Sequence, residues 1–221
     1  MEAWAEAYRA NNGVKTVKMV QNGIRPEGIA MLIKDGLSSC TGLETLDLQD
    51  NTFTSPGSEA LAKAVVGWEK MVELGVGDCL LGKGCSKVAR ALSEGRNKGL
   101  KILRLQYNEI DGTGVKAFKD ALEKALPALE KLELNGNKFS EDDGVVLKIK
   151  DIFAERGFGE LDELDDMEEE SDEEEEEEEE GEKGVEDVVK RAKEEEEQKV
   201  APEKDKAVDD LADLLAKKAT V

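Results

Sequence analysis

Apolar residues recur along the first two thirds of the chain in one pattern, L-x-x-L-x-L-x-x-N-x-L, in which other apolar residues can replace leucine. The pattern fits five times, and its first apolar position falls at Val14, Leu43, Met71, Leu100 and Leu129. The copies therefore repeat every 28 or 29 residues. Five matches in one phase indicate an array of repeats rather than a chance distribution of leucine.

Each copy predicts a short strand followed by a turn. The leading apolar residues alternate with polar ones, which directs one edge of a strand toward the core. The position written N in the pattern carries an amide or thiol side chain that can hydrogen-bond the backbone of a neighbouring turn. These side chains form a predicted structural ladder of Asn22, Asn51, Cys79, Asn108 and Asn137.

A helical half follows the predicted strands, because apolar residues then recur at helical spacing. This spacing is found in residues 60–65, 115–126 and 145–153. Glycines at the entrance to these halves, Gly28, Gly57 and Gly114, are expected to provide a tight turn. Strand, turn and helix in a repeat of this length predict an α/β leucine-rich-repeat solenoid of five repeats, curved, with a parallel inner sheet and outer helices.

Residues 1–12 have the pattern of a helix with Trp4 and Tyr8 on one side, leading directly into the first predicted strand. Such a segment is the helical half of a repeat that lacks its strand. A solenoid normally begins with a polar cap, whereas this one begins with an apolar flank. We therefore expect Met1 to fall inside a longer array.

The charge divides the chain near residue 160. The chain has a net charge of −21, yet residues 1–159 are close to neutral and are predicted to form the repeat array. Residues 160–182 hold 18 acidic side chains and no basic one, which predicts a disordered segment. Residues 183–221 form a charged tail, in which apolar spacing predicts a short helix at 207–218. That helix is either a partner-binding element, such as a nuclear export signal, or an inert end.

Composition excludes several classes of function. The chain has no histidine, and its three cysteines lack the spacing of a disulfide framework or a metal site. We therefore expect no metal, no cofactor and no self-contained catalytic group. The sequence also lacks an apolar run of membrane-spanning length and a basic nucleic-acid footprint, so neither a membrane nor a nucleic acid is an expected partner.

Several stretches resemble the C-terminal half of fungal Ran GTPase-activating proteins over about residues 1–170. They include loop residues that the repeat pattern does not dictate. The stretches are KMVQNGIRPEGI (18–29), LDLQDNTFTSPGSEALA (46–62), LRLQYNEI (103–110), LELNGNKFSEDD (132–143) and RGFGELDELDDMEEE (156–170). The tail resembles that family only in its acidity and its loosely spaced leucines.

The resemblance implies a regulator that stimulates GTP hydrolysis by Ran in nucleocytoplasmic transport. It implies GTP-bound Ran as the partner, with a Ran-binding protein as a further component, in the cytoplasm or at the nuclear envelope. Members of the family supply no arginine finger; an asparagine from their N-terminal repeats helps to position the catalytic glutamine of Ran. This chain begins after the repeats that carry that asparagine, so the fragment is expected to be inactive alone and no residue here is given the catalytic role.

Two surfaces are candidates for binding Ran. The concave face is predicted to be lined by Lys18, Asp47, Gly75, Arg104 and Glu133. Adjacent strands lie about 4.8 Å apart, so Lys18 can meet Asp47 and Arg104 can meet Glu133. These residues form either a self-satisfied charge ladder, weak at under about 1 kcal/mol per pair, or a surface that faces Ran.

The second surface is the rim, the set of loop residues that follows each strand: Gln21, Asp50, Asp78, Tyr107 and Gly136. Loops on a rigid scaffold are the usual binding elements, although acidic loop residues can also be merely solvated. The predicted partner-binding residues are thus Lys18, Gln21, Asp47, Asp50, Asp78, Arg104 and Tyr107. The alternative function is a leucine-rich-repeat scaffold, or a histone-chaperone-like acidic module, for basic partners.

Overall fold

The structure, a computed structural model, describes residues 1–168. The predictions for residues 169–182 and for the charged tail at 183–221, with its helix at 207–218, lie outside the described residues. The repeat array can be compared with the structure in full.

One parallel sheet forms the inner layer of the described residues. Its strands follow one another in chain order, and each pairs with the next in parallel. The strands are β1 (Thr16–Lys18), β2 (Thr45–Asp47), β3 (Glu73–Gly75), β4 (Ile102–Arg104), β5 (Lys131–Glu133) and β6 (Glu160–Leu161). The register places equivalent core residues opposite each other, as with Leu46 and Leu74. The predicted parallel inner sheet is confirmed.

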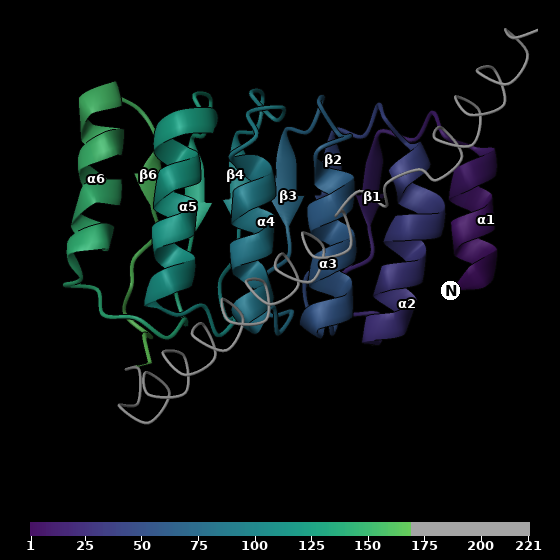
Figure 1. Cartoon of the computed structure of the whole chain (residues 1–221), viewed down its shortest axis with the longest axis horizontal. Helices are drawn as coiled ribbons and strands as arrows, with labels where there is room; N and C mark the ends of the chain where they lie inside the picture. Colours follow the sequence, from purple (N-terminus) through teal and green to yellow (C-terminus); the bar gives the residue numbers. More distant parts are fainter. Residues whose placement is uncertain (169–221) are drawn as a thin grey trace, which may run out of the picture. The chain divides into compact units, whose positions relative to one another are not determined.

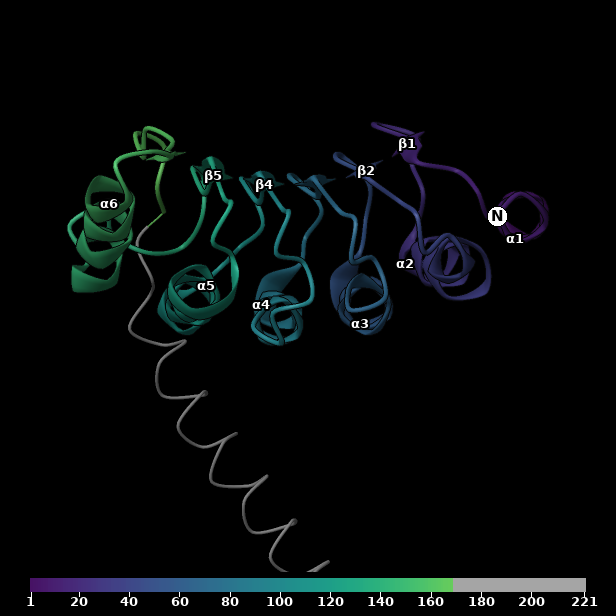
Figure 2. The same cartoon turned by 90° about the horizontal axis from the view of Figure 1, so that it is seen from above.

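Helices form the outer layer. They are α1 (Glu2–Ala10), α2 (Pro26–Met31), α3 (Thr54–Val65), α4 (Cys85–Leu92), α5 (Gly112–Ala125) and α6 (Gly144–Arg156). A π-helical turn η1 (Leu32–Gly36) and a 3-10 turn η2 (Leu37–Ser39) extend α2, and a 3-10 turn η3 (Gly82–Gly84) precedes α4. Helices lie beside one another in chain order (Figure 1). Viewed from above, both layers bend the same way, with the strands on the inner side (Figure 2).

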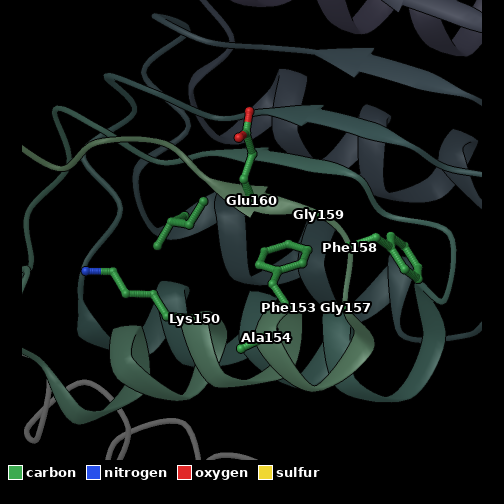
Figure 3. Close-up of a pocket in the computed structure, with 8 residues that line it drawn as sticks. Lys150, Phe153, Ala154, Gly157, Phe158, Gly159 and Glu160 are labelled. Atoms are coloured by element: carbon green, nitrogen blue, oxygen red, sulfur yellow. The ribbon is translucent and has the colours of Figure 1, made fainter.

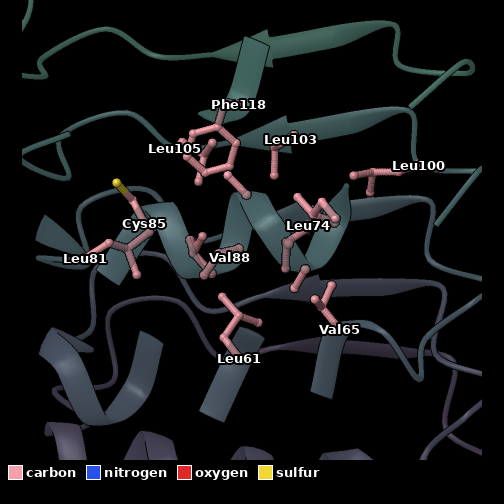
Figure 4. Packing of buried hydrophobic residues seen from close by; sticks show 14 of the residues in the cluster. Leu61, Val65, Leu74, Leu81, Cys85, Val88, Leu100, Leu103, Leu105 and Phe118 are labelled. Carbon is pink, nitrogen blue, oxygen red and sulfur yellow. The ribbon is translucent and has the colours of Figure 1, made fainter. Parts of the chain in front are cut away.

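The core lies between the two layers and runs continuously through the array. Leu74 and Leu103 of the sheet face the layer that contains Val88 of α4 and Phe118 of α5 (Figure 4). All four are buried. Burying one such side chain stabilises the folded state by about 1.5–3 kcal/mol. Side chains of the neighbouring repeats provide part of this burial. The repeats therefore depend on one another for stability.

The glycines at the helix entrances do not act as predicted. Gly57 and Gly114 lie within the first turns of α3 and α5 rather than in a tight turn before them. A Cβ at Gly57 would lie 3.0 Å from Ile29, and a Cβ at Gly114 would lie 2.5 Å from the Cys85 sulfur. Absence of a side chain thus lets adjacent helices approach closely, which is the physical reason for glycine here.

The array has six strands where the sequence predicted five repeats. β6 pairs with β5 through Glu160 and Leu161, and Leu164 beyond it is buried. Residues 160–168 were assigned from their charge to a disordered segment, but the described part of the acidic stretch is folded. The edge of β5 offers backbone N–H and C=O groups to another strand. Hydrogen bonds to these groups offset the conformational entropy lost when a few acidic residues are ordered.

Candidate partner-binding surface

The rim residues share one unusual backbone conformation. Gln21, Asp50, Asp78 and Tyr107 have φ values of 55°, 57°, 51° and 53°, and Gly136 has 69°. Left-handed backbone is uncommon outside glycine and persists where the surroundings determine it. Each rim residue directly precedes a ladder residue. The side chains of Gln21, Asp78 and Tyr107 are exposed and that of Asp50 is half-buried.

The ladder residues fix these turns from below. Asn108 is buried; its Oδ1 accepts from the backbone N–H of Cys79 at 3.1 Å and of Leu81 at 3.2 Å. Its Nδ2 donates to the carbonyls of Val76 at 2.8 Å and Leu105 at 3.0 Å. One amide side chain thereby joins its own turn to the turn of the preceding repeat.

The other ladder positions vary around this arrangement. Asn51 and Asn137 are buried and bridge their neighbouring turns in the same way. Asn22 is exposed and donates to the carbonyl of Val20. The Cys79 thiol lies 3.4 Å from the carbonyl of Leu48, and burial raises its pKa to about 12. Burial likewise raises the pKa of Cys85 to about 12, so neither thiol is an activated nucleophile.

The concave face holds a compact ion-pair cluster. Arg104 pairs with Glu73 on one side and, at 3.4 Å, with Glu133 on the other. Lys131 adds a contact of 2.7 Å to Glu133. The predicted pairing of Arg104 with Glu133 is therefore present, and Arg104 is engaged within the chain.

Lys18 and Asp47 lie opposite each other in register, but the described contacts include no ion pair between them. The Asp47 carboxylate accepts instead from Gln49 Nε2 at 2.9 Å. Lys18 stays exposed at the first strand. The prediction that these two residues meet is wrong, because the neighbouring glutamine satisfies the carboxylate.

Gly75 in β3 and Gly77 in the turn after it have no side chains, which leaves room for other side chains to cross the concave face. Gln106 Nε2 donates to Gln49 Oε1 at 2.7 Å, which bridges two strands that are not neighbours. A Cβ at Gly77 would lie 2.4 Å from Gln106. Gly75, predicted to line this face, is buried beneath Asp47, with 3.0 Å between its Cβ position and the carboxylate. The repeat pattern does not predict this bridge.

An acidic clamp, formed by Asp162, Asp165 and Asp166, covers the last turn of the array. The Asp162 carboxylate accepts from the backbone N–H of Leu134 at 2.7 Å and of Asn135 at 3.0 Å. Burial raises the pKa of Asp162 although these two donors oppose the rise. Asp165 accepts from the Asn135 amide at 2.8 Å.

Tyr107 connects the rim to this clamp. Its hydroxyl donates to Asp166 Oδ2 at 2.9 Å, and this bond raises the pKa of the tyrosine. Its ring lies over Gly136, where a Cβ would be only 2.2 Å away. Sequence reasoning missed the clamp, although Phe158 and Leu161 continue the repeat phase of Leu129 and Leu132. That continuation was the available signal.

Two cavities adjoin the described surface. One, of about 470 Å³, lies where α6 turns into β6 and is lined by Phe153, Phe158 and Lys150 among others (Figure 3). The other, of about 420 Å³, lies beside the rim between the starts of α3 and α4 and is lined by Thr54, Leu80 and Glu109 among others. The second borders the predicted binding surface.

Within residues 1–168, no group of three or more His, Cys, Asp or Glu side chains is arranged to hold a metal ion. In the same part of the chain, no helix has the length and apolar character needed to cross a membrane.

Comparisons with known proteins agree with this geometry. A family model described as "Leucine Rich repeat" matches residues 39–62 and 96–119. Ran GTPase-activating protein 1 of Saccharomyces cerevisiae is 46% identical over 136 residues, which cover 60% of this chain and 33% of that protein. The chain therefore spans about a third of the length of the curated relative that it matches.

A solved structure titled "Leiomodin-1 Actin-Binding Site 2 (ABS2)" matches with a TM-score of 0.56 and 18% sequence identity, covering 70% of this chain and 88% of the other. At that identity the likeness concerns the fold alone.

Proposed function

Since the chain is a homologue of yeast Ran GTPase-activating protein 1 over 136 residues, we propose that it binds the small GTPase Ran in its GTP-bound form. It acts as part of a GTPase activator in nucleocytoplasmic transport, in the cytoplasm or at the nuclear envelope. Identity of 46% over that length is the observation that carries the proposal. A Ran-binding protein is a further component of the proposed complex.

The rim is the proposed contact surface. Gln21, Asp50, Asp78 and Tyr107 stand on turns whose backbone is fixed by the ladder below them, and rigidly held loops lose little entropy on binding. Arg104, by contrast, is engaged by Glu73 and Glu133. We therefore assign the concave ion-pair cluster to stability and the rim to recognition.

The proposed role is regulatory, and the described repeats contribute binding rather than the family's glutamine-positioning asparagine. Asn51, Asn108 and Asn137 are buried, and their amides are used by neighbouring turns. None of these three can reach a partner. A second candidate function, a scaffold for basic partners, is favoured by the acidic rim residues Asp50 and Asp78 and by the acidic stretch after residue 160.

The test combines binding with hydrolysis. Purified chain is titrated into Ran loaded with a non-hydrolysable GTP analogue or with GDP, and single-turnover hydrolysis of Ran·GTP is measured at saturating chain. We expect preference for the GTP form and hydrolysis at the intrinsic rate, whereas activation normally gives about 10³–10⁵-fold. Equal binding of an unrelated basic protein, with no nucleotide preference, would support the scaffold instead. Acceleration of about a hundredfold would place catalytic groups within this chain.

A further inference from the structure

Leu80 is an exposed apolar residue two positions after Asp78, the middle residue of the rim. It follows Asp78 and the ladder residue Cys79, and 44% of its surface is exposed. It also lines the 420 Å³ cavity beside the rim, together with Thr54 and Glu109. The apolar surface of this side chain is largely available to a partner.

The backbone of Leu80 is unfavourable for leucine. Its φ is 54°, in the left-handed region that glycine adopts most readily. The equivalent positions of the first and fourth repeats, Gly23 and Glu109, have the same conformation, with φ values of 61° and 56°. Leucine at this turn is therefore strained, and its exposed side chain adds little burial in return. Strained residues of this kind concentrate at functional sites, where another requirement maintains them.

Three carboxylates belong to the turns around this apolar point. Asp78 lies two residues before Leu80, Glu109 lines the same cavity, and Asp50 belongs to the preceding rim turn. Among the described residues, no ion pair involves any of these three side chains. Lys83 and Lys87 also line the cavity, and Lys87 is paired with Glu59 at 2.5 Å. The carboxylates of Asp50 and Asp78 on the rim and of Glu109 in the cavity wall carry no such pairing within the described part of the chain, and an apolar centre beside them fits a basic partner surface.

Of the other exposed apolar residues, Val20 directly precedes the rim residue Gln21 in the first repeat and Val72 directly precedes β3. Trp4 and Met31 belong to the first helices of the array, and Leu147 and Phe158 belong to its last helix and the turn after it. Tyr107 is on the rim, but its hydroxyl is held by Asp166. Leu80 thus combines exposure, strain, a cavity and unpaired acidic neighbours.

We propose that Leu80 and its cavity are the apolar anchor of the GTPase contact, receiving an apolar side chain that is flanked by lysine or arginine on Ran. This inference rests on the proposed function and adds the residue and the partner chemistry. Burial of the anchor slows dissociation, while Asp50, Asp78 and Glu109 speed association through their charge.

The test uses Leu80→Gly in the full chain. Glycine relieves the left-handed strain, so the melting temperature should stay equal or rise, while Kd for GTP-bound Ran should increase about tenfold. Loss of binding could then not be ascribed to unfolding. Leu80→Met, which keeps an apolar side chain, should bind within about threefold of the wild type. Leu147→Ala, which removes an equally exposed apolar residue from α6, is the matched control and should leave Kd unchanged.

Three results separate the hypotheses. If the wild type binds Ran and Leu80→Gly binds equally well, the anchor is wrong and the proposed function stands. If Leu80→Gly lowers the melting temperature, leucine is required by the fold and the inference is overturned. If the wild type binds neither nucleotide form of Ran, the proposed function and the anchor both fail.

Discussion

At the scale of single residues, the ladder shows how one amide can hold two adjacent turns together. Asn108 accepts from Cys79 and Leu81 and donates to Val76 and Leu105. The rim conformation directly above it depends on these bonds, since left-handed turns persist only where their surroundings hold them.

We expect Asn108→Ala to lower the free energy of unfolding by about 3 kcal/mol, because buried N–H and carbonyl groups lose their partners. Urea unfolding followed by circular dichroism measures the change. Asn22→Ala is the control, since Asn22 is exposed at the first turn, and it should cost under about 0.5 kcal/mol. If the two substitutions lowered the free energy of unfolding equally, burial of the amide would be shown to be unimportant for stability.

At the scale of elements, the sixth strand is stabilised by its neighbour and by the acidic clamp. Its two residues form too little structure to be stable alone. Pairing with β5 and the bonds from Asp162 to Leu134 and Asn135 satisfy the backbone edge that β5 would otherwise expose.

We expect Asp162→Ala to destabilise the array by about 2 kcal/mol, because two backbone donors lose their acceptor. Glu163→Ala removes an exposed neighbouring carboxylate and should change stability by under about 0.5 kcal/mol. Hydrogen exchange at Leu134 and Asn135 localises the effect: both amides should exchange faster in Asp162→Ala alone. Unchanged protection there would mean that the clamp contributes nothing to β5.

At the scale of the whole array, the flank where α1 and β1 lie exposes apolar side chains. Trp4 is 52% exposed, and Val20 and Met31 are also exposed. β1 is the first strand of the sheet and has a neighbour on one side only. An open strand edge beside apolar side chains favours self-association.

Sedimentation at several concentrations should therefore reveal self-association, and the dye ANS should bind. Replacing Trp4 and Val20 by glutamate should weaken both, whereas Leu147→Glu, at a site 51% exposed on α6, should change neither. A monodisperse monomer that binds no dye would show instead that α1 caps the array adequately.

The repeat, and with it most of the fold, follows from the spacing of apolar residues along the chain. A spacing of 28 or 29 residues placed strands β1–β5 and the ladder, because a solenoid satisfies its backbone and buries its apolar residues between adjacent repeats. The spacing also predicts the positions of the rim residues, since the loop residue before each ladder residue recurs in the same phase. The pattern did not find β6, whose acidic composition concealed its continuation of the repeat.

Which side chains are available to a partner depends on contacts between repeats. Arg104 and Lys18 look alike in sequence, yet two glutamates engage Arg104 and Lys18 stays exposed. Three further features depend on neighbours at least one repeat away or on local backbone angles. They are the close approach of helices at Gly57 and Gly114, the hydrogen bond from Gln106 to Gln49, and the strained backbone of Leu80. A repeat pattern fixes the phase of each residue, whereas contacts across repeats and φ angles follow from packing in three dimensions.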